Sequence, residues 1–497
     1  MLRILGSKKR LCDGLTRRDL LQVGGLSPFG LGLSQAMGMW QSEAQAAELS
    51  NRFGKAKSCI LLVLFGSPPQ HETFDPKPDA PLDIQGEMQA IPTSVPGLHI
   101  GEGLPQTAKI IDRTTIVRSL THPYPIHGLA YALSGGPTPD LPMELTPRDP
   151  RHWPFIGSVV DHLEARRHGG APQELLHNVA MPWLFYSKSD YPPISGPYSG
   201  FLDQKHDPVW TTFDAKGTKF VPNCITGTES SPDFFDPYAG IRPNDTLGFA
   251  DGKLSSDVGP SRLENRWSLL EQFDAQRRTV DAADTASFTH DQAMAYSLLT
   301  SSKMHKAMDV RREAMKVRER YGMTLFGQAT LTARRLVEAG SKFVTVFCDA
   351  YGDFGKGWDT HVHHYPRLKQ YLLPVFDQTY SALILDLESR GLLDDTLVLC
   401  LSEHGRTPEI SNSNGGGRDH WSKAYSAIFA GGGMGAGNVV GQTDAIAGEV
   451  AETPVSPKDV LATAFYLMGI DPKTTIHDRL GRPHPIAGAG RVRTEFF

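Results

Sequence analysis

The most restrictive feature of this sequence is a set of short apolar runs, each followed at once by polar residues. The first, SCILLVLF, spans residues 58–65, and TTIV at 114–117, KFVTVF at 342–347 and TLVLCL at 396–401 have the same character. Strands that are apolar on both faces are typical of a parallel sheet covered by helices on each side. The runs therefore predict an α/β fold with a mostly parallel central sheet and helices on both faces.

The segments between these runs are expected to supply the covering helices. Apolar residues between 372 and 387 recur at close to a 3.6-residue period, and Gly391 marks the end of this crossover helix. A longer helical region is expected over 265–339. The stretch 137–260 is rich in Pro, Gly, Asp and Ser with weak periodicity. It is expected to form long loop insertions, which either shape a substrate mouth or serve as surface padding.

The first 46 residues differ in character from the rest. Three basic residues at 8–10 precede TRRDLL at 16–21, a mildly apolar Gly-rich stretch follows, and Ala-Gln-Ala at 44–46 matches a signal-peptidase site. This order resembles a twin-arginine signal peptide, which predicts export by the twin-arginine machinery to the periplasm or cell envelope. The apolar stretch is too short to span a bilayer, and no later segment is long enough, so no membrane span is expected after cleavage.

Composition narrows the class of partner. Hydrophobic residues make up 40% and charged residues 21% of the 497 residues, as in an ordinary folded protein with a large core. The net charge is −5, and no Lys/Arg run is interleaved with aromatic residues, so a nucleic-acid partner is not expected. The cysteines show no CxxC spacing. Cys59, Cys348 and Cys400 lie in or beside apolar runs, where they are expected as core residues rather than disulfides or ligands.

Acidic and histidine residues cluster after two of the apolar runs. LSEHGRT at 401–407 ends the last run, with GWDTHVHH at 357–364 upstream and GRDHW at 417–421 downstream. A carboxylate supplies charge and an imidazole supplies a nitrogen donor, a mixture that suits a divalent metal. Because ligands gather at the carboxyl ends of parallel strands, two neighbouring metal positions are expected there. The expected ligands are Asp359, His361 or His363, Glu403, His404 and His420, whereas His364 is expected on the surface.

The metal itself is predicted from the donor types. Abundant imidazole favours Zn²⁺ or Mn²⁺, and Ca²⁺, which prefers an all-oxygen shell, is the alternative.

This pattern resembles the alkaline-phosphatase-like superfamily, whose usual S-D-H-G element corresponds to Ser-Glu-His-Gly at 402–405. Finer motifs are similar to an uncharacterised, twin-arginine-exported bacterial branch, a domain of unknown function labelled sulfatase-like. These motifs are GWDTH, RGLLDDTLV at 390–398, GRTP at 405–408, GRDHW and AGGGMGAGNVVGQTD at 430–444. The likeness runs from about Cys59 to the C-terminus and implies one alkaline-phosphatase-like domain over 47–497. It implies no particular substrate.

The resemblance is altered just after the first apolar run. Where the branch has GGPSH-x-DTFDPKP, this chain reads GSPPQHETFDPKP at 66–78. Gln70 therefore stands at the branch's His position and Glu72 at its first Asp, while His71 is displaced by one residue and Asp75 keeps the pattern. Glu72 is expected either as a further metal ligand or as an exposed acid in a Pro-rich turn.

The superfamily also implies a nucleophile after its second strand, where a Ser, Thr or modified Cys attacks phosphorus or sulfur. The corresponding segment is RSLTHPYPIHG at 118–128. It implies Thr121 as first choice of nucleophile and Ser119 as second, with Arg118 as an oxyanion clamp and His122 or His127 as acid, base or extra ligand. A helix N-cap is the alternative role for the hydroxyl. The C/S-x-P-x-R signature of formylglycine formation is absent, which disfavours an ordinary formylglycine sulfatase.

Three functions follow from these residues. The leading hypothesis is an exported, metal-dependent hydrolase of phosphate or sulfate esters, acting on a small molecule or a polysaccharide. The alternative is a non-catalytic, metal-stabilised binding or scaffold protein with the same fold, which the altered segment at 66–78 favours. A metallophosphomutase-like transferase would share the ligands, but its sugar-phosphate substrates are cytoplasmic, which conflicts with export.

Overall fold

The structure is a computed structural model of the chain, and it describes residues 49–136, 141–168, 175–221, 234–249, 301–352 and 357–497. Residues 49–52 are helical. Residues 54–497 form one compact unit, to which all the elements below belong. The predicted signal peptide and the part of the predicted helical region at 265–300 lie outside the described residues.

A nine-stranded sheet runs through this unit, in the order β15-β4-β14-β11-β1-β10-β5-β6-β9, in which β15 spans Asn438–Val440. β1 (Ser58–Leu64) lies between β10 (Phe343–Cys348) and β11 (Thr396–Leu401) and pairs in parallel with both. Every residue of these three strands is buried, as their continuous apolar character predicts. The predicted α/β fold with a mostly parallel sheet is confirmed.

Two of the nine strands run against the others. β14 (Tyr425–Ala430) is antiparallel to both of its neighbours, β11 and β4 (Thr114–Leu120), so β4 again points the same way as β11. β9 (Gly248–Phe249) is antiparallel to β6 at the far edge. The carboxyl ends of β1, β4, β10 and β11 consequently lie along one edge of the sheet, where ligands of such sheets bind.

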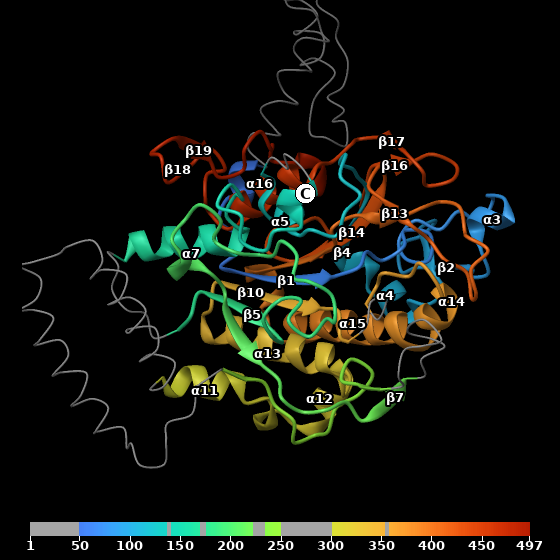
Figure 1. Cartoon of the computed structure of the whole chain (residues 1–497), viewed down its shortest axis with the longest axis horizontal. Coiled ribbons are helices and arrows are strands. Elements are labelled where there is room, and N and C mark those ends of the chain that lie inside the picture. The colour runs from blue at the N-terminus through green and yellow to red at the C-terminus, as the bar shows by residue number, and fades with distance from the viewer. Residues whose placement is uncertain (1–48, 137–140, 169–174, 222–233, 250–300, 353–356) are drawn as a thin grey trace, which may run out of the picture. The chain divides into compact units, whose positions relative to one another are not determined.

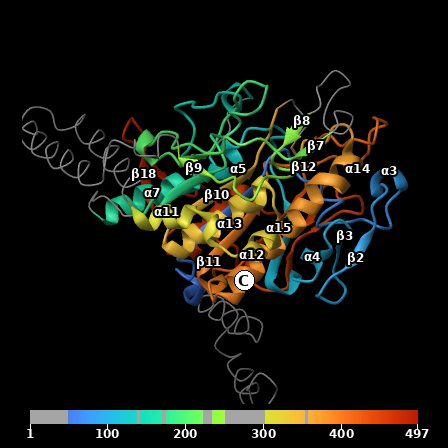
Figure 2. The same cartoon turned by 90° about the horizontal axis from the view of Figure 1, so that it is seen from below.

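Helices cover both faces of the sheet, as Figures 1 and 2 show. α13 (Leu325–Ala339) and α15 (Leu373–Ser389) lie on one face, and α7 (Ile156–Arg167) and α16 (Pro457–Leu467) lie on the other. Successive residues of a strand point to opposite faces. β1 accordingly gives Ile60, Leu62 and Leu64 to the first core, and Cys59, Leu61 and Val63 to the second.

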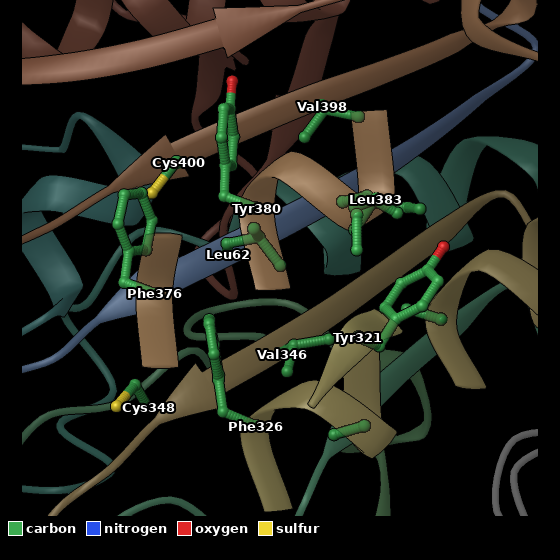
Figure 3. Close-up of a cluster of buried hydrophobic side chains, with 14 of the residues drawn as sticks. Leu62, Tyr321, Phe326, Val346, Cys348, Phe376, Tyr380, Leu383, Val398 and Cys400 are labelled. Carbon is green, nitrogen blue, oxygen red and sulfur yellow. The ribbon is translucent and has the colours of Figure 1, made fainter. Parts of the chain in front are cut away.

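Figure 3 shows the first core, where Leu62 of β1 and Val346 of β10 face Leu383 of α15. Cys348 and Cys400 belong to this core. With Cys59 they are free, buried thiols, so their predicted role as core residues is confirmed. Burial raises the pKa of Cys348 to about 12, which keeps this thiol neutral. The other two cysteines of the chain lie outside the described residues.

The expectation of loops over 137–260 is wrong in part. This stretch contains α7, β5 (Asn178–Met181) and β6 (Val209–Thr212), and β5 pairs in parallel with β10. These strands are four residues long, too short for an apolar pattern to stand out between the Pro-rich and Gly-rich segments that flank them. Among the described residues, no helix combines the length and hydropathy needed to cross a bilayer.

Candidate metal centre

The segments that follow three strands meet at the carboxyl edge of the sheet. The loop after β4 carries His127, the segment after β10 carries Asp359 and His361, and the turn after β11 carries Glu403 and His404. A two-residue hairpin, β12 (Gly405–Arg406) with β13 (His420–Trp421), then returns His420 to the same place. The topology thus gathers six side chains that are up to 293 positions apart in the chain, counted from 127 to 420.

His127 lies at the centre of these six side chains. Its Nδ1 atom is 2.8 Å from Oε1 of Glu403, and its Nε2 atom is 3.2 Å from Oδ1 of Asp359. The atoms that could ligate a metal form two groups, in each of which all the atoms lie within 4.8 Å of one another. These groups are His127, Asp359, His361 and His420, and His127, Glu403 and His404. The arrangement fits two adjacent metal positions, with His127 available to either.

Asp359 is the anchor of the first group. Its Oδ1 atom lies 3.0 Å from Nε2 of His361, 3.4 Å from Nε2 of His420 and 2.5 Å from Nη2 of Arg406. Burial alone would raise the pKa of this carboxyl, but the Arg406 charge and the neighbouring imidazoles hold it well below its usual range. Asp359 is therefore a carboxylate, the form that binds a metal.

His404 anchors the second group, and its orientation is fixed by its own turn. Its Nδ1 atom lies 2.8 Å from the carbonyl oxygen of Gly405, so Nδ1–H donates there and Nε2 keeps its lone pair. Burial, together with the charges of His127 and Arg406, lowers the pKa of His404 well below its usual value. The ring is neutral, as a metal ligand must be.

Three buried atoms of the centre lack a hydrogen-bond partner in the described part of the chain. They are Oδ2 of Asp359, Oε2 of Glu403 and Nε2 of His404. A buried polar atom left without a partner costs on the order of 1–3 kcal/mol, so three in one place call for a bound group. Two carboxylates and several imidazoles form the mixed N/O donor set of a divalent metal site. Asp359 and Glu403 outweigh burial and raise the pKa of His127 to about 9, so a metal would displace a proton from this ring. The residues present fit such a metal.

The loop after β1 contributes backbone to the centre. The N–H of Gly66 donates to Oε1 of Glu403 at 2.8 Å. Gly66 has a φ of +98°, and a Cβ atom at this position would lie 2.3 Å from the backbone nitrogen of Asp359. Glycine is required here because any side chain would push the two loops apart.

The side chains of this loop turn to other partners. Nε2 of Gln70 donates to the carbonyl oxygen of Arg406 at 2.7 Å, and Oε1 of Gln70 accepts from the N–H of Arg406 at 3.0 Å. Nε2 of His71 lies 2.8 Å from the carbonyl oxygen of Ile446. Gln70 thus stabilises the turn after β11 instead of binding a metal.

Glu72 lies outside both groups of ligand atoms. Its carboxylate is 2.6 Å from Nη2 of Arg418 and 3.4 Å from Nε2 of His364, and all three side chains are buried. The expectation that His364 lies on the surface is therefore wrong. Nδ1 of His364 is 2.7 Å from Oγ1 of Thr360, so the ring is held on both sides. In the GSPPQHETFD segment, Glu72 therefore forms a buried ion pair with Arg418, at a position where the resemblance implied a metal ligand.

His363 also lies outside both groups. It is the N-cap of α14 (His364–Arg367) with a φ of +52°, and its N–H donates to the carbonyl oxygen of Asn414 at 2.8 Å. The structure brings together the predicted ligands Asp359, His361, Glu403, His404 and His420 with His127, which the resemblance implied as an acid, base or extra ligand. It leaves out Glu72 and His363.

Of the residues implied for catalysis, His127 lies in the centre, but Arg118 and Ser119 do not belong to either group of ligand atoms. Nε of Arg118 donates to the carbonyl oxygen of Phe74 at 2.7 Å, and Nη2 donates to that of His99 at 2.9 Å. These two donors bind backbone oxygens, which does not fit the implied role as an oxyanion clamp. Ser119 is fully buried, and a Cβ atom on Gly441 would lie 2.0 Å from its Oγ. A substrate in solvent cannot reach this hydroxyl. Thr121 is partly exposed.

His122 contacts the backbone of the centre at Glu403. Its Nε2 atom lies 2.7 Å from the carbonyl oxygen of Glu403, and its Nδ1 atom accepts from the N–H of Tyr124 at 3.1 Å. Burial lowers the pKa of His122 to about 4, so the ring is neutral and Nε2–H is the donor. This histidine positions the backbone that carries Glu403.

Sequence reasoning missed two side chains of the centre. Arg406 is fully buried beside Asp359, and Asp419 lies with Oδ1 2.6 Å from Nδ1 of His361. Arg406 stands inside the motif GRTP and Asp419 inside GRDHW, two of the motifs that carry the resemblance. Their positions in the sequence could have identified them, because each lies within two residues of a predicted ligand.

Fold and site together define an α/β protein with a candidate two-position metal centre at the carboxyl edge of a mostly parallel sheet. Residues 56–497 match the model of a family described as "Protein of unknown function (DUF1501)". The chain belongs to this family. No curated protein matches the sequence.

Several solved structures are similar at low identity. PsFucS1 sulfatase from Pseudoalteromonas sp. is 11% identical with a TM-score of 0.39, and the match covers 92% of this chain and 75% of that chain. Ps i-CgsB is 10% identical with a TM-score of 0.37, covering 83% and 72%. The phosphonate monoester hydrolase SpPMH from Silicibacter pomeroyi is 12% identical with a TM-score of 0.32, covering 83% and 72%. At this overlap, the substrates of these proteins do not define the substrate of this chain.

Proposed function

We propose that this protein is a metal-dependent hydrolase of phosphate or sulfate esters. The observation that carries the proposal is the uneven burial of the centre. The side chains of Asp359 and Glu403 are 7% and 1% exposed and that of His404 is buried, whereas those of His127, His361 and His420 are 13%, 31% and 25% exposed. The centre has a buried acidic floor and a rim of imidazoles that solvent reaches.

This arrangement favours catalysis over a purely structural metal. Structural metal sites are closed by protein ligands, whereas catalytic sites keep a position open for water or substrate. The rim of the centre is open on the side of His361 and His420, and the floor is closed. An ester group would therefore approach from the imidazole side.

Different residues of the chain have different roles in the proposed reaction. A divalent metal, proposed as Zn²⁺ or Mn²⁺, would supply a Lewis acid that polarises an ester oxygen. Arg406 holds Asp359 in its ionised form, and the Asp419 carboxylate orients His361 through Nδ1. Thr121 is the proposed nucleophile, because it is a partly exposed residue that follows β4 directly and precedes His122.

The second candidate function is a non-catalytic, metal-stabilised binding or scaffold protein. The positions of Glu72 and Arg118 favour it. Glu72 is held by Arg418 away from the centre, and the donors of Arg118 are taken up by backbone carbonyls. A protein that had lost catalytic activity would keep the buried floor of the centre, but it would not need Glu72 or Arg118 at the metal.

The substrate and the compartment are part of the same proposal. The ester belongs to a small molecule or a polysaccharide, and the twin-arginine machinery delivers the protein to the periplasm or cell envelope. Replacing both arginines of the signal, Arg17→Lys and Arg18→Lys, should retain the full-length chain in the cytoplasm. Unchanged fractionation of this variant would contradict the export route.

The first test of the function is metal analysis of the purified protein. We expect about two metal equivalents, which should be lost in the variant Glu403→Ala/His404→Ala/His420→Ala. A panel of aryl phosphate and sulfate esters then tests turnover by the loaded wild-type protein. Metal without turnover of any ester would support the scaffold alternative. Absence of metal after incubation with Zn²⁺, Mn²⁺ and Ca²⁺ would overturn both.

A further inference from the structure

We propose that His162 and His206 form a second binding site for a divalent transition metal, outside the centre described above. His162 lies on α7, and His206 ends the short helix η3 (Gln204–His206) that precedes β6. Neither residue belongs to either group of ligand atoms in the main centre. The site would be built on the face of the sheet that α7 covers.

The distance between the two rings suits a shared metal. Nδ1 of His162 is 3.1 Å from Nε2 of His206, and the ring planes are 89° apart. Two nitrogens that ligate zinc tetrahedrally at 2.0–2.1 Å lie about 3.3–3.4 Å apart. A metal ion bound to both nitrogens would lie off the line that joins them, so the nitrogens would move apart by a few tenths of an ångström and the partly exposed ring of His162 would turn toward the metal.

A carboxylate orients the inner ring. Nδ1 of His206 lies 2.7 Å from Oδ2 of Asp161, so this nitrogen donates its proton to Asp161 and directs Nε2 toward His162. A carboxylate, a histidine and a metal in this order recur in protein metal sites, because the acid fixes the tautomer and raises the basicity of the ligand. His206 is 3% exposed, so the ring cannot turn freely.

The outer ring is accessible and neutral. His162 is partly exposed at the surface of α7, which leaves room for water to complete the coordination of a metal. Burial, with the charges of His206, Arg166 and Lys205, lowers the pKa of His162 to about 4. The imidazole is therefore unprotonated at neutral pH. The charges of Arg166 and Lys205 oppose a metal ion, and the Asp161 carboxylate offsets part of that repulsion.

The donor set defines the ligand class. Two imidazoles with water favour Zn²⁺, Ni²⁺ or Cu²⁺ over Mg²⁺ or Ca²⁺, which prefer oxygen. A metal here would join α7 to the segment that leads into β6 and would stabilise the folded state by binding it selectively. This role does not depend on hydrolysis at the main centre.

The test is a titration with Zn²⁺ and with Ni²⁺ of the full chain that carries Glu403→Ala/His404→Ala/His420→Ala, so that both ligand groups of the main centre lose members and binding there is weakened. We expect one equivalent to bind and to raise the melting temperature. His162→Gln should abolish this binding, and Asp161→Asn should weaken it by about 10- to 100-fold. His168→Gln, at the end of the same helix, is the matched control and should bind as the parent does.

His206→Gln replaces a buried ring, so its fold must be checked by circular dichroism, whereas His162 is partly exposed and its variant should fold. If His162→Gln binds the same equivalent with the same affinity as His168→Gln, the proposal is wrong and the pair is a hydrogen bond only. No binding by the parent would also overturn it. Either result would leave the main centre and its proposed hydrolysis untouched.

Discussion

Nη2 of Arg406 lies 2.5 Å from Oδ1 of Asp359, and both side chains are buried. The same guanidinium donates to the carbonyl oxygens of Gly66, Ser67 and Arg418. One side chain therefore joins the loop after β1, the segment after β10 and the hairpin after β11. It holds together the backbone of the candidate metal centre, and its charge keeps Asp359 ionised.

Arg406→Ala should destabilise the fold strongly. Removing one partner of a buried ion pair leaves an uncompensated charge, which costs roughly 3–5 kcal/mol in the free energy of unfolding. Chemical denaturation with metal removed measures this loss. Arg113→Ala is the matched control, because Arg113 makes ion pairs with Asp112 and Glu388 at the surface and should cost below about 1 kcal/mol. Equal losses in the two variants would contradict the role given to Arg406.

Gly66→Ala should displace Asp359. The added Cβ would meet the backbone nitrogen of Asp359 at 2.3 Å, and φ is +98°, so we expect a loss of about 1–3 kcal/mol and weaker metal binding. Gly97→Ala has a similar φ of +82° but nothing within 4 Å of the new atom. This control separates backbone strain from the clash. Metal binding that is unchanged in Gly66→Ala would show that the two loops move independently.

Thr121→Ala should abolish hydrolysis without affecting the fold, if Thr121 is the nucleophile. Thr121→Ser keeps a hydroxyl and should retain a measurable kcat, whereas Thr121→Ala should lose on the order of 10³-fold or more. Circular dichroism and metal content should be the same for both variants. An Ala variant as active as wild type would remove Thr121 from the mechanism and favour direct attack by water.

The fold was predictable because its central strands are buried on both faces. The runs at 58–65 and 396–401 are apolar at every position after their first residues, Ser58 and Thr396, and the structure places them as β1 and β11. β5 and β6 were not predicted. Each strand is only four residues long and lies toward one side of the sheet, so neither needs a long apolar run. β5 is a strand because it pairs with β10, and β6 is a strand because it pairs with β5.

The candidate centre was predictable to the extent that its residues follow strands. Asp359, Glu403 and His404 come directly after strand ends or within a short motif, and parallel topology brings those ends together. The partners of Glu72 and His364 were not predictable, because Arg418 reaches Glu72 across 346 positions of sequence. A buried ion pair and a metal ligand use the same residue types, so only the fold distinguishes them.

Acidification should destabilise the protein through buried neutral histidines. Burial, reinforced by the Arg418 charge, lowers the pKa of His71 from 6.5 to about 4. The folded state therefore excludes a proton that the unfolded state accepts as the pH falls below about 6.5. The stabilising contribution is complete above that pH and is lost progressively down to about pH 4, at a rate of up to about 1.4 kcal/mol per pH unit.

His71→Gln should make this pH dependence shallower. Denaturation midpoints measured with EDTA between pH 7 and pH 4.5 should fall less steeply for the variant, since glutamine can still donate to the carbonyl oxygen of Ile446 but cannot titrate. His99→Gln is the control, because His99 is exposed, and its curve should follow the wild type. His122, whose pKa burial also lowers to about 4, should leave part of the slope in place. Parallel curves for His71→Gln and wild type would mean that the His71 ring is protonated, or reaches solvent, in the folded state.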